Sequence, residues 1–149
     1  MLRAAVIALA LAACSSSKSS SSSHVEVVAA PAEGSAATYI AREVERGARE
    51  GVPVLVYVGA TWCEPCRDFH AAAAAGSLDA ELGPLRLLEF DLDRDADRLA
   101  AAGYRSALVP LFARPNADGS ASGAQTDGVR QGGDYVAQLT PRIRALLRP

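Results

Sequence analysis

The chain has 149 residues, and half of them are hydrophobic, so it can form one domain with an ordinary apolar core. Its formal net charge of −2 argues against a broad basic surface, and we expect no nucleic-acid partner. The only lysine, Lys18, lies in a serine tract, which excludes a catalytic lysine from the folded part. Three cysteines and two histidines argue against a four-ligand zinc site, and we expect no resident metal or organic cofactor.

A short apolar run follows Arg3 at the start of the chain, with the sequence AAVIALALAA over residues 4–13. As a helix it would rise about 15 Å, half of the ~30 Å hydrocarbon core, so it is typical of a signal peptide and not of a membrane span. The run ends in Leu-Ala-Ala-Cys at residues 11–14, which resembles a bacterial lipobox. We therefore expect residues 1–13 to be a lipoprotein signal peptide and Cys14 to be acylated. An ordinary secretory signal that ends in a chance cysteine is the alternative.

A serine-rich segment follows Cys14. Residues 15–23 are serine at every position except Lys18, and such a tract cannot bury apolar surface. We interpret residues 14–34 as a flexible tether and residues 35–149 as the folded domain. Acylation at Cys14 would anchor that domain in the bacterial cell envelope, facing the periplasm. Ser15 in place of an aspartate slightly favours the outer membrane.

The remaining sequence predicts alternating helices and strands. Helices are expected at Ser35–Glu50, Cys63–Ala75, Arg94–Ala102 and Asp134–Leu147, and three of them end at or next to a glycine. Strands are expected at Val52–Val58, Leu85–Leu92, Leu108–Ala113 and, weakly, Gln125–Arg130, with a turn over residues 115–123. A βαβ unit followed by a hairpin and a helix predicts an α/β fold, a mixed central sheet with helices on both faces.

The second and third cysteines, Cys63 and Cys66, lie three residues apart, directly after a buried-type strand and at the start of a helix. Positions i and i+3 share a helix face, so the pair can form a disulfide. The helix N-terminus favours negative charge and lowers the pKa of the first thiol. Cys63 is therefore the candidate nucleophile, and Cys66, which we expect to be more shielded, is the candidate resolving thiol. Pro65 fits the first helical turn because its missing N–H has no partner there.

The sequence Ala-Thr-Trp-Cys-Glu-Pro-Cys-Arg at residues 60–67 resembles the W-C-x-x-C active site of the thioredoxin superfamily. Leu-Val-Pro at residues 108–110 is similar to the segment in which that family carries a hydrophobic residue and a cis-proline opposite the cysteines. The resemblance covers roughly residues 52–147. It implies a thioredoxin fold and a redox-active disulfide, with Trp62 beside the disulfide and Val109 and Pro110 helping to bind the substrate chain. A core position is the alternative for Trp62.

Two positions depart from that family. Tyr57 stands where classical thioredoxins have a buried aspartate that relays protons, and Glu89 aligns with a lysine near that aspartate. Glu89 or a water can replace the usual acid–base group, although a solvated carboxylate at a strand end is the simpler interpretation of Glu89. Glu64 lies between the cysteines, and we hypothesise that its charge opposes ionisation of Cys63 and makes the couple more reducing.

The resulting prediction is an extracytoplasmic thiol–disulfide oxidoreductase that exchanges disulfides with exported proteins through Cys63 and Cys66. It requires a membrane redox partner for recycling and contacts membrane lipid through acylated Cys14. The alternatives are a structural disulfide, a copper-handling lipoprotein that uses Cys63, Cys66 and His70, and a non-catalytic adaptor. His70 is more simply interpreted as a surface residue of its helix. The Asp/Arg-rich run over residues 91–98 is interpreted as a solvated turn that begins a helix.

Overall fold

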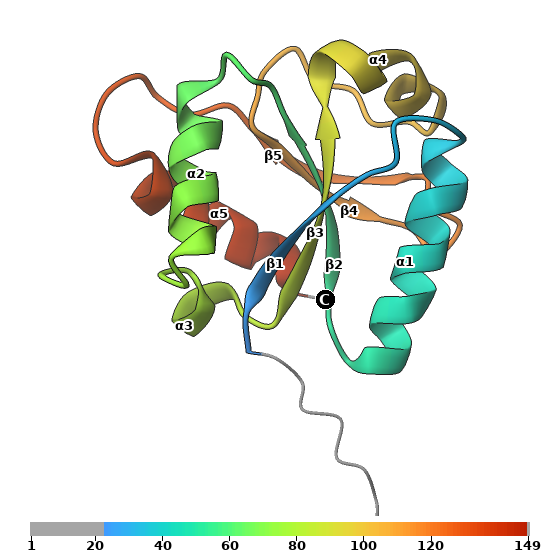
Figure 1. Cartoon of the computed structure of the whole chain (residues 1–149), viewed down its shortest axis with the longest axis horizontal. Helices are drawn as coiled ribbons and strands as arrows, with labels where there is room; N and C mark the ends of the chain where they lie inside the picture. Colours follow the sequence, from blue (N-terminus) through green and yellow to red (C-terminus); the bar gives the residue numbers. More distant parts are fainter. Residues whose placement is uncertain (1–22, 149) are drawn as a thin grey trace, which may run out of the picture.

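The computed structural model describes residues 23–148, and these residues form one sheet covered by helices on both faces (Figure 1). The strands are β1 (Val25–Ala29), β2 (Val54–Gly59), β3 (Leu85–Asp91), β4 (Leu111–Pro115) and β5 (Ala121–Asp127). The helices are α1 (Ala36–Glu50), α2 (Glu64–Ala74), α3 (Asp79–Leu82), α4 (Leu92–Ala101) and α5 (Tyr135–Leu147). None of the helices in this described part is long and apolar enough to cross a bilayer. The expected signal peptide and Cys14 lie outside the described residues.

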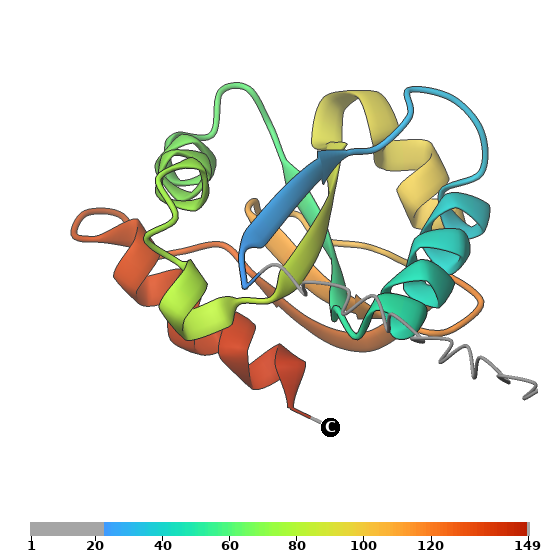
Figure 2. The same ribbon diagram turned by 60° about the horizontal axis from the view of Figure 1, so that its bottom comes forward.

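The strand order is β1-β3-β2-β4-β5, in which β1, β3 and β2 are parallel and β4 and β5 are antiparallel additions. Parallel neighbours require crossover connections, and α1 and α2 provide them on opposite faces. Figure 2 shows α2, α3 and α5 together on one side of the sheet and α1 and α4 on the other. The predicted mixed α/β sheet is therefore confirmed, and its strand order and directions are those of a thioredoxin fold.

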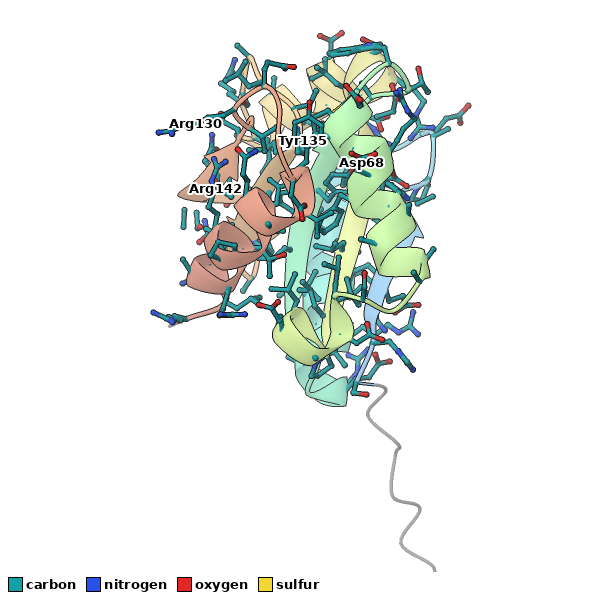
Figure 3. The ribbon with its side chains drawn as sticks, turned by 90° about the vertical axis from the view of Figure 1, so that its left-hand side faces the viewer. Asp68, Arg130, Tyr135 and Arg142 are labelled. Carbon is teal, nitrogen blue, oxygen red and sulfur yellow. A yellow bond between two sulfur atoms is a disulfide. The ribbon has the colours of Figure 1, made fainter. Side chains whose placement is uncertain are left out.

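Each face of the sheet has its own apolar core. The α2–α5 face buries Tyr57, Phe69, Phe112, Leu139 and Ile143 together with both cysteines of the pair. The α1–α4 face buries Tyr39, Ile40, Phe90, Leu99 and Tyr104. Alternate residues of β2 and β3 supply the two cores, because successive strand side chains point to opposite faces. Figure 3 looks onto the face that α2 and α5 cover side by side.

The helix boundaries follow local signals that the sequence contains. Ser35 caps α1 by accepting a hydrogen bond from the Thr38 N–H at 3.2 Å, and Gly51 ends the helix at a φ of 69°. Asp91 caps α4, and Asp134 caps α5. Such caps satisfy backbone N–H groups that have no partner inside the helix. The predicted helices are confirmed to within a few residues at either end.

Two elements were not expected, and three predicted boundaries were wrong. Val25–Ala29 was assigned to the tether, but it forms edge strand β1 on β3, so the fold begins before the predicted start at Ser35. The short helix α3 was also missed. The third predicted strand begins later than expected, at Leu111, directly after Pro110. This strand, β4, lies inside the sheet between β2 and β5. The fourth lies earlier, at Ala121–Asp127.

Candidate functional site

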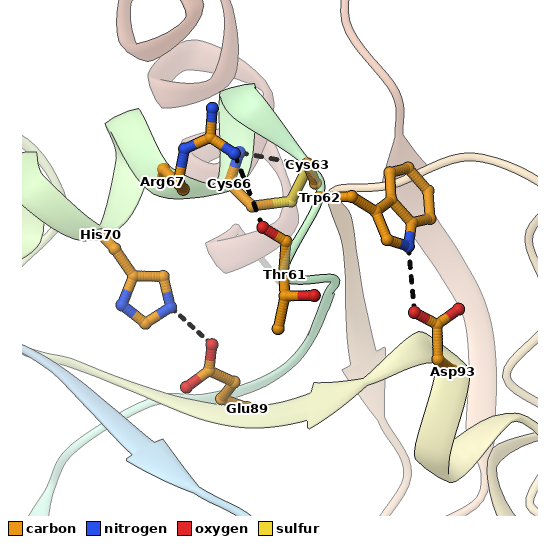
Figure 4. The surroundings of a disulfide bond; sticks show 8 residues. All are labelled: Thr61, Trp62, Cys63, Cys66, Arg67, His70, Glu89 and Asp93. Atoms are coloured by element: carbon orange, nitrogen blue, oxygen red, sulfur yellow. Dashed lines mark hydrogen bonds and ion pairs between the residues drawn. A yellow bond between two sulfur atoms is a disulfide. The ribbon is translucent and has the colours of Figure 1, made fainter.

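The site lies where β2 ends and α2 begins. The buried run of β2 leads into the loop of residues 60–62, and Cys63 then caps α2. Cys63 and Cys66 form a disulfide with a Cα–Cα distance of 5.2 Å. The Cys63 Sγ accepts a hydrogen bond from the Cys66 N–H at 3.2 Å, as a side-chain oxygen does in an ordinary N-cap (Figure 4). The first cysteine thus occupies the position at which a helix stabilises a negative charge.

Burial does not distinguish the two cysteines. Cys63 is 4% exposed and Cys66 is 3% exposed, so the expected stronger shielding of Cys66 is not found. Cys63 alone combines the capping position with the N–H directed at its sulfur, so local electrostatics single it out and accessibility does not. Pro65 lies buried in the first helical turn, as predicted, and Glu64 is exposed beside it.

Trp62 is 61% exposed, so the alternative that placed it in the core is wrong. Its indole Nε1–H donates to Asp93 Oδ2 at 2.9 Å, and this bond fixes the ring beside the disulfide (Figure 4). Asp93 lies in the first turn of α4, so the acidic run supplies a partner for the tryptophan. No signal in the sequence near Trp62 indicates this pairing across the fold.

The Val109–Pro110 peptide bond is cis and immediately precedes β4. Val109 is partly buried and packs against both core clusters, one of which contains Cys63 and Cys66. Pro110 itself is buried, whereas neighbouring Leu108 is 58% exposed. Trp62 and Leu108 are the large hydrophobic side chains that lie exposed among the described residues. We call these two exposed side chains the apolar rim.

A cavity of about 440 Å³ lies beside Cys66, and we call it the polar cavity. It is lined by Ala29, Tyr57, Gly59, Ala60, Thr61, Cys66, Arg67, His70, Glu89, Phe90, Asp91 and Arg94. Tyr57 is fully buried, and its hydroxyl has no hydrogen-bond partner within residues 23–148. Burial, and then the charge of Glu89, raise the pKa of Tyr57, so the phenol keeps its proton.

Gly59 shows how close this hydroxyl comes to the sulfur. A Cβ added to Gly59 would lie 2.9 Å from Tyr57 Oη and 3.6 Å from Cys66 Sγ. The hydroxyl and the sulfur therefore flank the same small space, which only a glycine leaves open. Tyr57 also stacks on Phe112 at a centroid distance of 5.0 Å, and this contact holds the ring in place.

His70 and Glu89 meet across the polar cavity, with Nε2 and Oε1 2.5 Å apart (Figure 4). His70 is a surface residue of α2 with 39% of its side chain exposed, as the simpler interpretation held, and Glu89 is partly solvated at 30%. Their pairing with each other was not predicted. The hydrogen bond that His70 donates to Glu89 raises the pKa of His70, against the opposing effect of burial. Helical spacing from Cys66 to His70 was the available sequence signal.

The copper alternative required Cys63, Cys66 and His70 to converge. Among residues 23–148, no group of three or more histidine, cysteine, aspartate or glutamate side chains is placed to hold a metal ion. His70 instead pairs with Glu89, and the two sulfurs are bonded to each other. No observation favours the metal-handling alternative over redox chemistry.

No family model matches the chain, and no curated protein is similar to it. Solved structures of thioredoxins are similar in fold. A poplar thioredoxin h shares 20% identity with a TM-score of 0.49, covering 85% of this chain and 98% of its own. Thioredoxin O1 of Arabidopsis thaliana shares 21% identity with a TM-score of 0.48, over 84% and 99% of the two chains. A mutant thioredoxin of Halobacterium salinarum shares 19%, with a TM-score of 0.47, over 85% and 94%. The strand order and directions described above define the fold of this chain, which is thioredoxin-like and carries a C-x-x-C disulfide.

Proposed function

We propose that this protein is a thiol–disulfide oxidoreductase that uses Cys63 as nucleophile and Cys66 as resolving thiol. The observation that carries the proposal is the Cys63 sulfur at the N-cap of α2, where it accepts the Cys66 N–H at 3.2 Å. The same N–H and the helix dipole would stabilise a Cys63 thiolate in the reduced protein. A disulfide that closes so short a loop constrains the unfolded chain little, which argues against a purely structural role.

The exchange takes place in two steps. The Cys63 thiolate attacks one sulfur of a substrate disulfide, and the other substrate sulfur leaves as a thiolate. Cys66 then loses its proton and attacks Cys63 Sγ, which forms the Cys63–Cys66 disulfide and releases the second substrate sulfur as a thiolate. The protein is oxidised by two electrons and the substrate is reduced by two. The reverse sequence oxidises a substrate dithiol.

The apolar rim supports a polypeptide substrate. Trp62 exposes a large hydrophobic surface directly before Cys63 in the chain, and Leu108 exposes another, two residues before Pro110. Exposed large apolar side chains favour contact with another protein. Pro110, which precedes β4, and Glu64, in the first turn of α2, complete the surroundings that a substrate chain would meet.

The proposed setting is the bacterial cell envelope, with the domain anchored through acylated Cys14 and facing the periplasm. The apolar run of residues 4–13 and the small residues before Cys14 support this setting. Exported proteins with thiols or disulfides are then the substrates, and a membrane redox partner recycles Cys63 and Cys66.

Insulin reduction by the purified protein, with dithiothreitol as electron donor, tests the catalytic proposal. The wild type should accelerate precipitation of the insulin chains, whereas Cys63→Ser should be inactive. Cys14→Ser removes the one cysteine outside the Cys63–Cys66 pair and should retain full activity, which makes it the matched control. Equal activity of wild type and Cys63→Ser would contradict the proposal.

The anchoring proposal has a separate test in bacterial cells that express the full chain. Radioactive palmitate should label the wild type and Cys63→Ser, and both should sediment with membranes. Cys14→Ser should lose the label and the sedimentation. Label on Cys14→Ser would show that the acyl group is not attached to Cys14.

A further inference from the structure

Resolution of a mixed disulfide requires a proton acceptor for Cys66. A thiol is a poor nucleophile until it ionises, and a cysteine ordinarily does so only near a pH of about 8.5. Cys66 is 3% exposed, so bulk water has little access to its proton. Cys66 lines the polar cavity, which has both the volume and the polar lining to admit water.

Seven residues with titratable or charged side chains face the polar cavity. They are Tyr57 from β2, Cys66, Arg67 and His70 from α2, Glu89 and Asp91 from β3, and Arg94 from α4, while β1 contributes only Ala29. The two arginines are cations and accept no proton. Asp91 Oδ1 already accepts the Asp93 and Arg94 N–H groups, each at 3.0 Å, as the cap of α4.

The His70–Glu89 pair is the acceptor that this elimination leaves. The pair is partly buried, and the carboxylate raises the pKa of the imidazole from its ordinary value near neutrality. His70 lies four residues after Cys66, on the same face of α2, and both line the polar cavity. Such a group gains and loses a proton readily at neutral pH.

Tyr57 contacts both the space beside the sulfur and the His70 ring. Its buried hydroxyl flanks the same space as Cys66 Sγ, next to Gly59, and has no partner within residues 23–148. Its ring also packs against His70 at a centroid distance of 5.6 Å, and its strand position pairs with Glu89. A hydroxyl both accepts and donates a hydrogen bond, so it can pass a proton along while remaining neutral.

We propose that the His70–Glu89 pair takes up the Cys66 proton across the polar cavity while Cys66 attacks the mixed disulfide, a role that rests on the function proposed above. The Cys66 S–H bond breaks and the pair gains the proton. The Cys63–Cys66 bond forms as the bond from Cys63 to the substrate sulfur breaks, and the electron pair leaves on that substrate sulfur. In the oxidising direction the pair returns the proton to Cys66.

Reaction of the reduced protein with one equivalent of dithiobis-nitrobenzoate separates the two steps. The first release of nitrothiobenzoate reports attack by Cys63, and the second reports resolution by Cys66. At pH 7 we expect His70→Gln and Glu89→Gln to slow the second phase at least about tenfold, because general acid–base catalysis is lost. Their first phase should stay within about twofold of the wild type. Above a pH of about 9.5, where a cysteine ionises unaided, the second phases should converge.

His24→Gln is the matched control, since it removes the other histidine of the chain. His24 pairs with Asp79 and precedes β1, at the opposite end of the parallel strands from Cys63, and its removal should leave both phases unchanged. A loss of rate in His70→Gln or Glu89→Gln by the same factor at every pH, or no loss at all, would overturn the proposal. Absence of the first phase from the wild type would overturn the proposed function itself, and with it this role.

Discussion

Two regions of the molecule bury polar groups in opposite ways. At the start of α4, the Asp95 cluster comprises Asp95, Arg94, Arg98 and the Asp91 backbone. Both oxygens of the buried Asp95 carboxylate accept hydrogen bonds in this cluster. Arg94 donates to both carboxylate oxygens at 2.9 and 2.8 Å, Arg98 donates at 3.0 Å, and the Asp91 N–H donates at 2.9 Å. In the polar cavity, by contrast, the Tyr57 hydroxyl is buried without a partner in the described chain.

This difference indicates that the Asp95 cluster stabilises the fold, whereas the polar cavity is the better candidate for a functional region. Arg98 also donates to the Pro31 carbonyl at 2.5 Å, so the Asp95 cluster ties the segment before α1 to α4. A buried polar group without a partner costs stability, about 1–3 kcal/mol, and persists where function requires it. The polar cavity is lined by Cys66, and the Asp95 cluster adjoins this cavity through Asp91 and Arg94 without reaching the disulfide itself.

The largest expected effect lies in the Asp95 cluster. Asp95→Ala leaves two arginines without their buried carboxylate and should lower the free energy of unfolding by about 3–5 kcal/mol. Asp97→Ala, at an exposed position on the same helix, should change it by less than about 0.5 kcal/mol. Urea denaturation of both variants measures the difference. A loss below about 1 kcal/mol for Asp95→Ala would remove the structural role from this cluster.

The same carboxylate predicts a direction for acid denaturation. Burial alone would raise the pKa of Asp95, but the hydrogen bonds from Arg94, the Asp91 N–H and Arg98 lower it below its ordinary value. A lowered folded pKa stabilises the protein above the unfolded value of about 3.9, and this stability is lost as the pH falls through the folded pKa. In Asp95→Asn, the free energy of unfolding should therefore depend less on pH below a pH of about 4 than in the wild type. An unchanged acid limb would contradict the assignment.

Two buried tyrosines differ in whether their hydroxyl group has a hydrogen-bond partner. Tyr104 Oη donates to the Gly119 carbonyl at 3.0 Å, whereas Tyr57 Oη has no partner within residues 23–148. Tyr104→Phe should lower the free energy of unfolding of the oxidised protein by about 1 kcal/mol, and Tyr57→Phe should raise it by about 1 kcal/mol. Guanidinium denaturation decides the signs. Destabilisation by Tyr57→Phe would show that its hydroxyl is satisfied.

Glu64 tests whether an exposed charge adjusts the couple. Its carboxylate lies in the first turn of α2, directly after Cys63, where it opposes thiolate formation. Glu64→Gln should make the Cys63–Cys66 couple more oxidising by up to about 30 mV, the shift that corresponds to a tenfold change in the equilibrium constant. Equilibration with glutathione buffers measures the potential. A potential that stays the same or becomes more reducing would refute the hypothesis.

The smallest effect is expected from His70. Its hydrogen bond to Glu89 raises the pKa of the imidazole. A raised folded pKa adds stability that is fully present below the unfolded value of about 6.5 and disappears as the pH rises through the folded pKa. The pair is partly exposed, so the gain should not exceed about 1 kcal/mol. In the wild type this contribution to the free energy of unfolding should fall between pH values of about 6 and 8, and in His70→Gln the fall should be absent. A fall as steep as that of the wild type would show that other groups cause it.

The sequence predicts those parts of the fold that depend on local signals. The apolar run of β2, the caps at Ser35 and Gly51, and the cysteine spacing at the start of α2 each act within a few residues. Strand β1 was missed because Val25–Ala29 becomes a strand only through pairing with β3, some sixty residues later. A short segment next to a serine tract gives no local indication of such a partner.

The candidate site divides in the same way. The disulfide and its helix-capping geometry could be predicted, because both follow from adjacent residues. The bonds of Trp62 to Asp93 and of His70 to Glu89 join different elements, so no local pattern shows them. The Asp/Arg-rich run was interpreted as solvated, but Asp95 is fully buried. A run of alternating charges does not show which of its side chains will be buried, because that depends on how the helix packs against the rest of the fold.

The proposed chemistry depends on a Cys63 thiolate that the N-terminus of α2 stabilises at neutral pH. Iodoacetamide alkylation of the reduced protein over a range of pH values, with each cysteine assigned by mass spectrometry, measures the pKa of that thiol. We expect Cys63 to be alkylated with a midpoint clearly below the ordinary value of about 8.5, and well before Cys66. A Cys63 midpoint at or above that of free cysteine would contradict this expectation.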